Sequence, residues 1–382
     1  MKRLSILGST GSIGRQALQV CDARGFAVAA LAAGRDDKLL EEQIRKYRPA
    51  VAALFDEPRG RALAARLGGC GTRVLWGAAG VLECAGWADA DLVLNAIVGV
   101  AGLRPSLAAL ESGHPLALAN KESMVCGGAL VTALARERGL PILPVDSEHS
   151  AIFQCLRAGT HDEVEKLIVT ASGGPFFGLT AAQTADKTAA EALKHPNWRM
   201  GRKITVDSAT MMNKGFELME ARWLFGVPPE RLEAVVHRES IVHSLVAFRD
   251  GAVIAQLSPP DMRLPIQYAL DWPERQPSAL PRLNLAAVGR LTFFKPDEIN
   301  FPALPLCRAA MARGGNAGAA VNGANEEAVA LFLDGAIRFG ELVPLVRDGA
   351  AAVPYIDAPT LAEVLETDLL ARRNVRNLIK RR

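Results

Sequence analysis

The chain has 382 residues, with 44 Lys and Arg against 41 Asp and Glu. This length suits two or three domains of about 100 to 200 residues each, and the net charge of +3 gives no case for a nucleic-acid or membrane-surface partner. Six cysteines without a Cys-x-x-Cys pair argue against a disulfide framework or thiolate zinc site and favour a reducing cytoplasm. No stretch reaches the roughly 18 apolar residues of a membrane helix, so we expect a soluble protein.

The N-terminal part alternates helical patterns with short aliphatic runs, which start at Leu4, Ala27, Val51, Leu92, Pro115 and Pro141. This rhythm predicts a doubly wound parallel sheet. The first run leads into Gly8-x-x-Gly11-x-x-Gly14 and then a helical pattern, the order that dinucleotide binding requires. The spacing differs from Gly-x-Gly-x-x-Gly, so an ordinary tight turn remains an alternative.

The second aliphatic run ends at Gly34-Arg35, about 20 residues beyond the glycine turn. An acid at this point selects NAD, whereas a base accommodates the 2′-phosphate of NADP. Arg35 therefore favours NADPH. The neighbouring Asp36 is an unfavourable charge for a phosphate.

The last run delivers Asp146-Ser147-Glu148 to the C-terminal end of a strand, where open parallel sheets bind their ligands. In extended backbone Asp146 and Glu148 point the same way. With Glu217 they could form an all-carboxylate site for Mg²⁺ or Mn²⁺, because hard cations prefer oxygen ligands. The alternative is an acidic helix N-terminus with Asp146 as its cap.

A Ser-Gly-Gly turn at 172–174 opens a stretch of weak apolar periodicity that runs to His195, Trp198 and Met200. We interpret it as a mobile lid, because glycines permit hinge dihedrals while Trp198 and Met200 could cover a substrate. Ser172 could reach a phosphate group. A plain surface loop is the alternative, and His195 taken alone is more often structural.

The stretch 207–220, DSATMMNKGFELME, combines hydroxyls, an amide, an ammonium and carboxylates. Ser208, Asn213 and Lys214 could hold a phosphate through neutral hydrogen bonds and a mobile charge. On a helix Asn213 and Glu217 share a face, so the phosphate contacts and a carboxylate could line one pocket. The alternative is an amphipathic helix start capped by Ser208 or Asn213.

Further along the chain, 235–257 has two β-rich runs around Arg249-Asp250-Gly251, which predicts a hairpin. His237 and His243 on it are expected to pack or to face a subunit interface. Residues 272–305 are rich in proline, as in a linker, and Ala-rich helical patterns follow from Leu306. The basic C-terminus is expected to be a solvated helix end.

Several motifs closely resemble the 1-deoxy-D-xylulose 5-phosphate reductoisomerase family, and together they span nearly the whole chain. They are GSTGSIG, LANKES at 118–123, VDSEH at 145–149, SGGPF at 172–176, HPNWRMGRKITVDSATMMNKG at 195–215 and SPPDMRLPI at 258–266. The resemblance implies a homodimeric, NADP-dependent oxidoreductase of the non-mevalonate isoprenoid pathway. Such an enzyme converts deoxyxylulose phosphate, a phosphorylated sugar, to methylerythritol phosphate with NADPH and Mg²⁺ or Mn²⁺, with Co²⁺ also possible.

The resemblance also implies roles for individual residues. It assigns catalysis to Lys121, Glu148 and His195, and the metal to Asp146, Glu148 and Glu217. Substrate contacts are Lys121, Ser147, Glu148, Ser172, His195, Trp198, Ser208, Asn213, Lys214 and Glu217. Cofactor contacts are Thr10, Gly11, Ser12, Ile13, Gly34, Arg35, Asp36, Asn120, Glu122 and Gly201. Asp36 stands where the family commonly has Asn, and Phe216 replaces a frequent Leu.

The fold implied by the resemblance is α/β, in three parts. A Rossmann-like NADPH-binding domain at 1–146 precedes a central α+β catalytic and dimerisation domain with a flexible lid at 147–271. A linker at 272–300 then leads to a C-terminal helical domain at 301–382.

Two other functions fit parts of the sequence. A semialdehyde dehydrogenase has a similar glycine turn but needs a nucleophilic cysteine, and Cys126 and Cys155 lie in no recognisable nucleophile motif. A non-catalytic NADPH sensor would have no reason to assemble three carboxylates beside a phosphate site.

Overall fold

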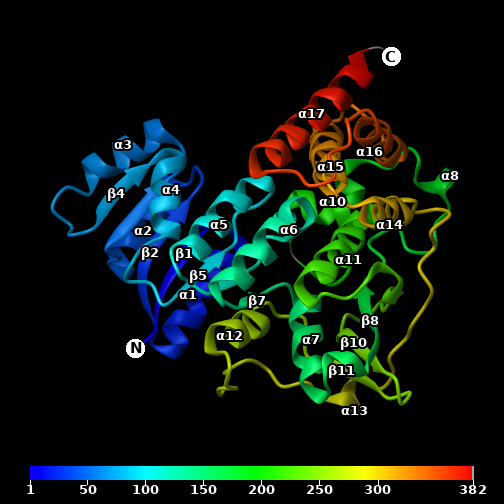
Figure 1. Ribbon diagram of the computed structural model, residues 1–382, viewed down its shortest axis with the longest axis horizontal. Helices are drawn as coiled ribbons and strands as arrows, with labels where there is room; N and C mark the ends of the chain where they lie inside the picture. The colour runs from blue at the N-terminus through cyan, green and yellow to red at the C-terminus, as the bar shows by residue number, and fades with distance from the viewer. Residues whose placement is uncertain (199, 381–382) are drawn as a thin grey trace. The chain divides into compact units, whose positions relative to one another are not determined.

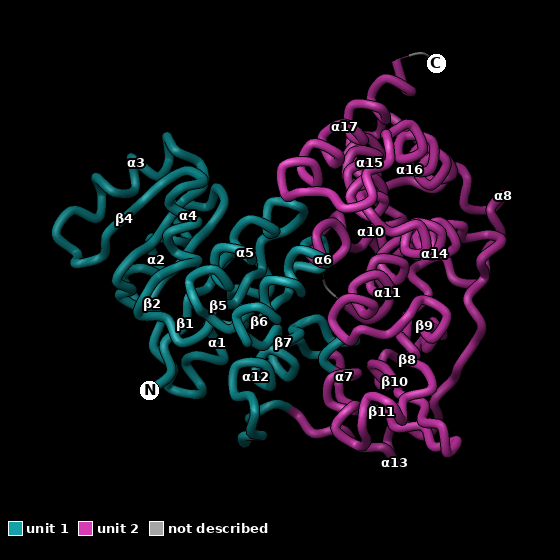
Figure 2. Tube along the Cα trace, viewed as in Figure 1, with its two compact units in different colours: residues 1–123, 129–150, 261–280 teal, residues 124–128, 151–260, 281–382 magenta. Residues whose placement is uncertain are grey.

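The computed structural model describes residues 1–198 and 200–380, and its helices and strands are labelled in Figure 1. The chain forms an α/β protein with two compact units, coloured separately in Figure 2. Unit 1 comprises residues 1–123, 129–150 and 261–280, and unit 2 comprises the other described residues. Each unit is described by itself below.

Unit 1 is built on a seven-stranded parallel sheet in the order β4-β3-β2-β1-β5-β6-β7. Its strands are β1 Arg3–Leu7, β2 Ala27–Ala33, β3 Val51–Leu54, β4 Arg73–Trp76, β5 Leu92–Asn95, β6 Leu116–Leu118 and β7 Ile142–Pro144. The predicted doubly wound sheet is confirmed. Strand β4 was missed by the sequence analysis, because this short edge strand begins with an exposed Arg73 and has no fully buried residue.

Helices connect these strands and cover the sheet. They are α1 Ser12–Arg24, α2 Asp37–Tyr47, α3 Glu57–Arg66, α4 Gly77–Ala85, α5 Leu103–Glu111, α6 Lys121–Arg138 and α12 Arg263–Asp271. Helix α4 packs against β1, β2 and β3, and α12 packs against α1. An ion pair of 3.0 Å between Arg24 Nε and Asp271 Oδ1 joins α1 to α12, so a late segment of the chain completes the N-terminal unit.

Unit 2 contains a four-stranded mixed sheet in the order β11-β10-β8-β9. Its strands are β8 Val164–Ala171, β9 Leu232–Val236, β10 Val242–Phe248 and β11 Val253–Leu257. Strands β8 and β9 are parallel, whereas β10 is antiparallel to both β8 and β11. The predicted hairpin is confirmed, with its turn at Arg249–Asp250–Gly251 between β10 and β11.

Unit 2 also contains α-helices. They are α8 Ala181–Thr184, α9 Ala189–Ala192, α10 Arg202–Thr210, α11 Met212–Phe225, α13 Leu285–Val288, α14 Ala303–Arg313, α15 Ala317–Leu333, α16 Leu342–Ala351 and α17 Leu361–Lys380. Of these, α11 packs against β8 and β9, while those after residue 300 make up the C-terminal region. Helix α7, Ser147–Cys155, begins in unit 1 and ends in unit 2. The helical C-terminal pattern is therefore confirmed, while residues 381–382 of the predicted basic end lie outside the described part of the chain.

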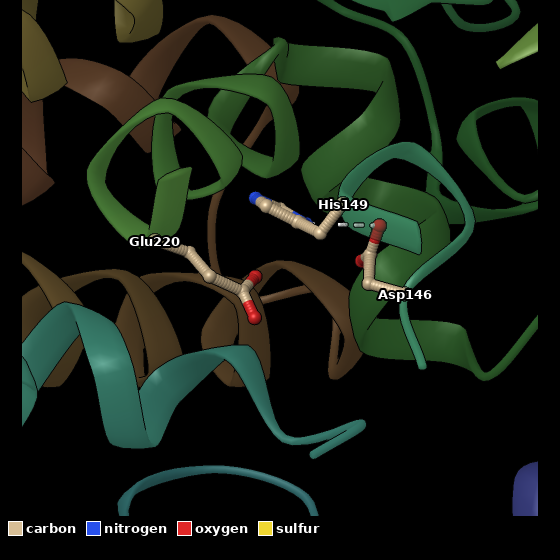
Figure 3. Close-up of side chains that lie close together, drawn as sticks. All are labelled: Asp146, His149 and Glu220. Carbon is tan, nitrogen blue, oxygen red and sulfur yellow. Dashed lines mark ion pairs between the residues drawn. The ribbon is translucent and has the colours of Figure 1, made fainter. Parts of the chain in front are cut away.

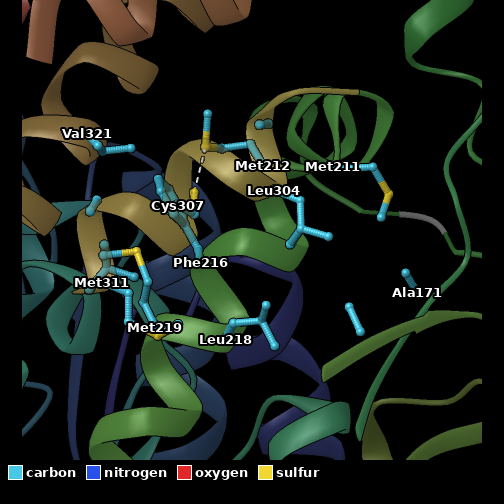
Figure 4. Close-up of a cluster of buried hydrophobic side chains, with 14 of the residues drawn as sticks. Ala171, Met211, Met212, Phe216, Leu218, Met219, Leu304, Cys307, Met311 and Val321 are labelled. Atoms are coloured by element: carbon cyan, nitrogen blue, oxygen red, sulfur yellow. Dashed lines mark hydrogen bonds between the residues drawn. The ribbon is translucent and has the colours of Figure 1, made fainter. Parts of the chain in front are cut away.

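The core of unit 2 centres on the contact between α11 and α14, shown in Figure 4. Phe216, Met212 and Cys307 are completely buried there, and the Cys307 Sγ atom lies 3.4 Å from Met212 Sδ. A Cβ atom on Gly215 would come within 2.5 Å of Cys307 Sγ, so the small residue permits the close approach of the helices. Burying each large side chain of this kind contributes about 1.5 to 3 kcal/mol.

Residues 272–300, the predicted linker, contain the short helix α13, and Phe294 forms a bridge to Val236 at the end of β9. The boundaries predicted at 146, 271 and 300 remain predictions about domains. Within the described ranges, no helix has both the length and the apolar character needed to cross a bilayer.

Candidate active site

The glycine turn lies between β1 and α1 at the C-terminal edge of the sheet in unit 1. Gly8 has φ +83°, and a Cβ atom there would lie 2.6 Å from the Ala96 carbonyl oxygen, so only glycine fits this approach to the segment after β5. Gly11 occupies the N-cap position of α1 in extended backbone. The first amides of a helix preceded by such a turn form a binding place for anions such as a pyrophosphate.

The end of β2 places Gly34, Arg35 and Asp36 next to this turn, because β1 and β2 are neighbouring parallel strands. Arg35 has a side chain that is 78% exposed, with its Nε atom 3.6 Å from Asp56 Oδ2. The Asp36 carboxylate accepts a hydrogen bond of 3.1 Å from the backbone N–H of Leu39 and so caps α2. Capping accounts for an acid here, because Asp and Asn are equally good N-caps.

Asn120 is the N-cap of α6, and its side chain is buried. Its Oδ1 atom accepts from the Ser123 N–H at 2.9 Å, and its Nδ2 atom donates to the carbonyl oxygens of Ile97 and Gly99. The side chain therefore fixes the segment after β5 relative to the start of α6. Glu122, in the first turn of α6, is also buried.

Asp146 ends the segment after β7 and forms charged and polar contacts within unit 1. Its Oδ2 atom lies 3.0 Å from Lys121 Nζ. Its Oδ1 atom lies 3.2 Å from His149 Nδ1, and a dashed line marks this pair in Figure 3. The backbone N–H of Glu148 donates to Oδ1 at 3.1 Å, and the Ser147 hydroxyl donates to Glu148 Oε2 at 2.5 Å. Asp146 and Glu148 thus lie together at the start of α7, and Lys121 offsets part of the negative charge of Asp146.

The stretch 207–220 forms two helices rather than one. Met211, with φ +67°, ends α10 and precedes α11, and it is buried. The left-handed conformation costs a non-glycine residue about 1 to 2 kcal/mol, so tertiary packing imposes it. Ser208 consequently lies on the last turn of α10, whereas Asn213 and the residues after it lie on α11.

Asn213, Lys214 and Glu217 form a polar cluster on the first turns of α11. The Nδ2 atom of Asn213 donates to Glu217 Oε1 at 2.6 Å, and Lys214 Nζ forms an ion pair with Glu217 Oε2. The prediction that Asn213 and Glu217 share a helix face is confirmed. Lys214 and Glu217 are both buried, so their charges act in a medium that screens them weakly.

A hydrogen bond joins His195 to Ser172 of the turn at 172–174, and the other contacts of the His195 ring determine which atom donates. His195 Nδ1 accepts from the backbone N–H groups of Asn197 at 3.2 Å and Trp198 at 3.0 Å, so the hydrogen is on Nε2. Nε2 then donates to Ser172 Oγ at 2.9 Å, and the Gly174 N–H donates to the same oxygen at 3.1 Å. With both lone pairs used, the Ser172 hydroxyl presents its own hydrogen to a further acceptor.

His195 is held in its neutral form. Burial, and secondly the positive charge of Arg238, lower the pKa of His195 from 6.5 to about 4. Burial likewise lowers the pKa of His243 to about 4, and the His243 ring lies 6.1 Å from that of Trp198. His237 and His243 are buried as expected, and His237 Nδ1 donates to the Thr292 carbonyl at 2.9 Å.

Gly174 joins the 172–174 turn to α10. It has φ +67°, and a Cβ atom there would lie 2.6 Å from the Ser208 carbonyl oxygen. The backbone of the turn therefore lies directly on the last turn of α10, which bears Ser208. Met200 and Gly201 precede α10, with Gly201 as its exposed N-cap.

The residues of these clusters that were not predicted from the sequence include His149 and Arg238. His149 lies one helical turn after Asp146, and that spacing is a usable signal. Arg238 has no local motif, yet it donates to the backbone carbonyl oxygens of Ser172 and Gly174.

A glycine turn on a parallel sheet is typical of nucleotide-binding enzymes, and an amide, an ammonium and a carboxylate on one helix face are suited to a phosphorylated ligand. Family models described as 1-deoxy-D-xylulose 5-phosphate reductoisomerase and its C-terminal domains match residues 4–128, 142–225 and 257–374. The chain belongs to the 1-deoxy-D-xylulose 5-phosphate reductoisomerase family.

Full-length relatives and solved structures agree with this assignment. The enzyme of that name from Lachnospira eligens is 47% identical over 96% of this chain and 97% of its own length. The one from Gloeobacter violaceus is 48% identical over 100% of this chain and 98% of its own length. The Zymomonas mobilis enzyme in complex with NADPH superposes with a TM-score of 0.93 at 39% identity and covers 99% of both chains. A reductoisomerase in complex with NADPH, fosmidomycin and magnesium gives a TM-score of 0.92 at 37% identity, covering 100% of this chain and 98% of its own.

Proposed function

We propose that the chain converts 1-deoxy-D-xylulose 5-phosphate to 2-C-methyl-D-erythritol 4-phosphate, using NADPH and a divalent cation, in non-mevalonate isoprenoid biosynthesis. The observation that carries this proposal is the Asn213–Lys214–Glu217 cluster on α11, in which Lys214 and Glu217 are buried, since it combines an amide and an ammonium suited to a phosphate with a carboxylate suited to a metal. The named relatives, 47 to 48% identical over nearly the full length, support it.

Most of the proposed cofactor contacts lie along the C-terminal edge of the unit 1 sheet. The turn residues Thr10, Gly11, Ser12 and Ile13 would receive the pyrophosphate, because α1 begins there. Gly34, Arg35 and Asp36 would border the adenosine ribose, with the exposed Arg35 side chain facing the 2′-phosphate. Asn120, Glu122 and Gly201 complete the proposed set. The Asn120 side chain caps α6 and also fixes the backbone of the segment after β5.

Asp146, Glu148 and Glu217 are the proposed metal ligands. Asp146 and Glu148 belong to the VDSEH motif at 145–149 and Glu217 closely follows the motif that ends at Gly215, and the family resemblance assigns the metal to these three positions. Oxygen donors fit Mg²⁺ or Mn²⁺, with Co²⁺ as a further candidate, and the lysine beside Asp146 offsets part of the negative charge. When bound, the cation supplies Lewis-acid polarisation of the substrate carbonyl.

The proposed substrate contacts are divided between a phosphate end and a reacting end. Ser172, Ser208, Asn213 and Lys214 would donate hydrogen bonds to the phosphate, to which the free Ser172 hydrogen is suited. Lys121, Ser147, Glu148, His195 and Glu217 would contact the carbon backbone, with Lys121, Glu148 and His195 in the catalytic roles. Trp198 in the proposed lid, with Met200, would exclude water from the aldehyde that NADPH reduces.

A homodimer in a reducing cytoplasm is the proposed state of the protein. Strand β11 ends the sheet order of unit 2, and the side chains of Val253 and Ile254 on it are 51% and 38% exposed. An exposed apolar edge strand is a template for pairing with another chain. All six cysteines are free, which suits a reducing compartment.

The proposal is tested by following the loss of NADPH absorbance with deoxyxylulose phosphate, with Mg²⁺ or Mn²⁺, and with a chelator. We expect turnover that stops with the chelator and yields methylerythritol phosphate. NADPH oxidation that continues without a metal, or a different product, would contradict it.

A further inference from the structure

The turn at 237–240, which follows β9, attaches three separate segments of unit 2 to one another. His237 and Glu239 both bind Thr292, the former through the Thr292 carbonyl at 2.9 Å and the latter through its hydroxyl at 2.7 Å. Ser240 has φ +51°, a left-handed conformation that is uncommon for a residue with a side chain. Contacts with Thr292 therefore help to hold this tight turn in its conformation. Arg238 lies within the turn, between His237 and Glu239.

The Arg238 side chain is hydrogen-bonded to the backbone of the Ser-Gly-Gly turn at 172–174. One Nη atom donates to the carbonyl oxygen of Ser172 and, at 2.8 Å, to that of Gly174. The guanidinium also lies over the Phe177 ring, 4.8 Å from its centroid. The Arg238 guanidinium thus binds the carbonyl oxygens of the residues before and after Gly173, and its packing on the Phe177 ring keeps it in place.

The same turn also holds the other end of the 172–198 segment. Asn197 Nδ2 donates to the Arg238 carbonyl at 2.6 Å and to Ser240 Oγ at 2.7 Å. The Asn197 N–H is one of the two backbone groups that donate to His195 Nδ1, and His195 in turn donates to Ser172. The direction of the Ser172 hydroxyl hydrogen therefore depends on contacts that converge on Arg238.

We propose that Arg238 is a positioning residue for substrate binding: by holding the carbonyls of Ser172 and Gly174, it keeps the Ser172 hydroxyl aimed at the substrate's phosphate group. Arg238 touches neither substrate nor cofactor in this role. The inference rests on the proposed function, which gives Ser172 its phosphate contact, and adds a residue that the motifs of the chain do not mark.

The test compares Arg238→Met and Arg238→Lys with Arg249→Met, which removes an exposed arginine at the β10–β11 turn. The Met variant should raise the KM for deoxyxylulose phosphate roughly 10-fold or more, the effect of losing charged hydrogen bonds. Its Kd for NADPH should not change. Lys, a single point donor that can satisfy one carbonyl, should recover part of the loss, and Arg249→Met should behave as wild type.

A double-variant cycle with Ser172→Ala separates this inference from the proposed function. If Arg238 acts through Ser172, Arg238→Met should raise KM much less in the Ser172→Ala background than in wild type. The role of Arg238 would be overturned if Arg238→Met raised KM equally in both backgrounds. It would also be overturned if Arg238→Met had a wild-type KM while Ser172→Ala had a raised one. Either result would leave the proposed function intact. A wild-type KM in Ser172→Ala would instead overturn the phosphate contact itself. If Arg238→Met does not fold, the same cycle is measured with Arg238→Lys.

Discussion

Single residues fix protonation and hydrogen-bond direction in unit 2. His195 is neutral because its ring is half-buried and lies near the positive charge of Arg238. Its Nδ1 atom is occupied by two backbone donors, so it can donate only through Nε2. A neutral histidine that donates to Ser172 leaves the serine hydrogen for a ligand, which a charged imidazolium could not do without losing both backbone contacts.

The depressed pKa of His195 predicts a dependence of stability on pH. Between its ordinary pKa of 6.5 and its folded value of about 4, the unfolded chain binds more protons than the folded one. Stability should therefore fall as pH falls through this window and be unaffected by His195 above it. Urea unfolding across this range should show a shallower loss for His195→Gln than for wild type. Parallel pH profiles for the two proteins would mean that His195 is not held neutral.

Lys214 is the proposed charge that meets the substrate phosphate. Replacing it by Met keeps much of the apolar stem and removes the ammonium, which also leaves Glu217 without its ion-pair partner. We expect a KM for deoxyxylulose phosphate raised roughly 10- to 100-fold, since hydrogen bonds to charged groups contribute about 1.5 to 3 kcal/mol. Lys380→Met, at the exposed end of α17, is the control. Steady-state kinetics in which both variants have the wild-type KM would refute the contact.

At the scale of elements, the break between α10 and α11 and the Ser-Gly-Gly turn determine where the polar side chains lie. Because Met211 has a left-handed conformation, α10 ends there and α11 begins as a separate helix. The first turns of α11 carry Asn213 and Lys214. The backbone of Gly174 packs on the carbonyl of Ser208 at the end of α10. The turn and the two helices therefore form one packed group within unit 2.

This contact predicts different costs for two glycine substitutions in the same segment. Gly174→Ala meets the Ser208 carbonyl oxygen at 2.6 Å as well as an unfavourable φ of +67°, whereas Gly178 has a φ of +82° with open space around it. Gly178→Ala should cost about 1 to 2 kcal/mol from backbone strain alone. Gly174→Ala should lose more stability and also bind deoxyxylulose phosphate more weakly. Thermal unfolding and KM compare the pair, and equal behaviour would show that the turn does not depend on this packing.

Local patterns were sufficient to predict the parallel sheet, the β10–β11 hairpin and the shared face of Asn213 and Glu217. They rest on alternation, turn chemistry and helical spacing, which are visible over a few residues. The left-handed Met211 was not predictable, since burial among distant helices imposes it against the residue's own preference. The contact of Arg238 with Ser172 was also not predictable from local patterns, because it joins residues 66 positions apart in the sequence.

At the scale of the whole molecule, both units draw on distant parts of the chain. Helix α12, from residues 263–271, completes the N-terminal unit, while the sheet of unit 2 ends in the exposed edge of β11. If this edge forms the proposed dimer, Ile254→Lys should weaken association by placing a charge on it. Sedimentation should then show wild type at twice the chain mass of 40.7 kDa and the variant shifted toward the monomer. A monomeric wild type would contradict the dimer.

Glu217 is proposed to bind one divalent cation together with Asp146 and Glu148. The most direct measurement is turnover of Glu217→Gln at saturating Mg²⁺ or Mn²⁺, with the Kd for NADPH measured on the same preparation. Gln keeps the size of the side chain and removes the charge, so we predict wild-type NADPH binding and no detectable turnover. Retained turnover with metal present would contradict the metal assignment.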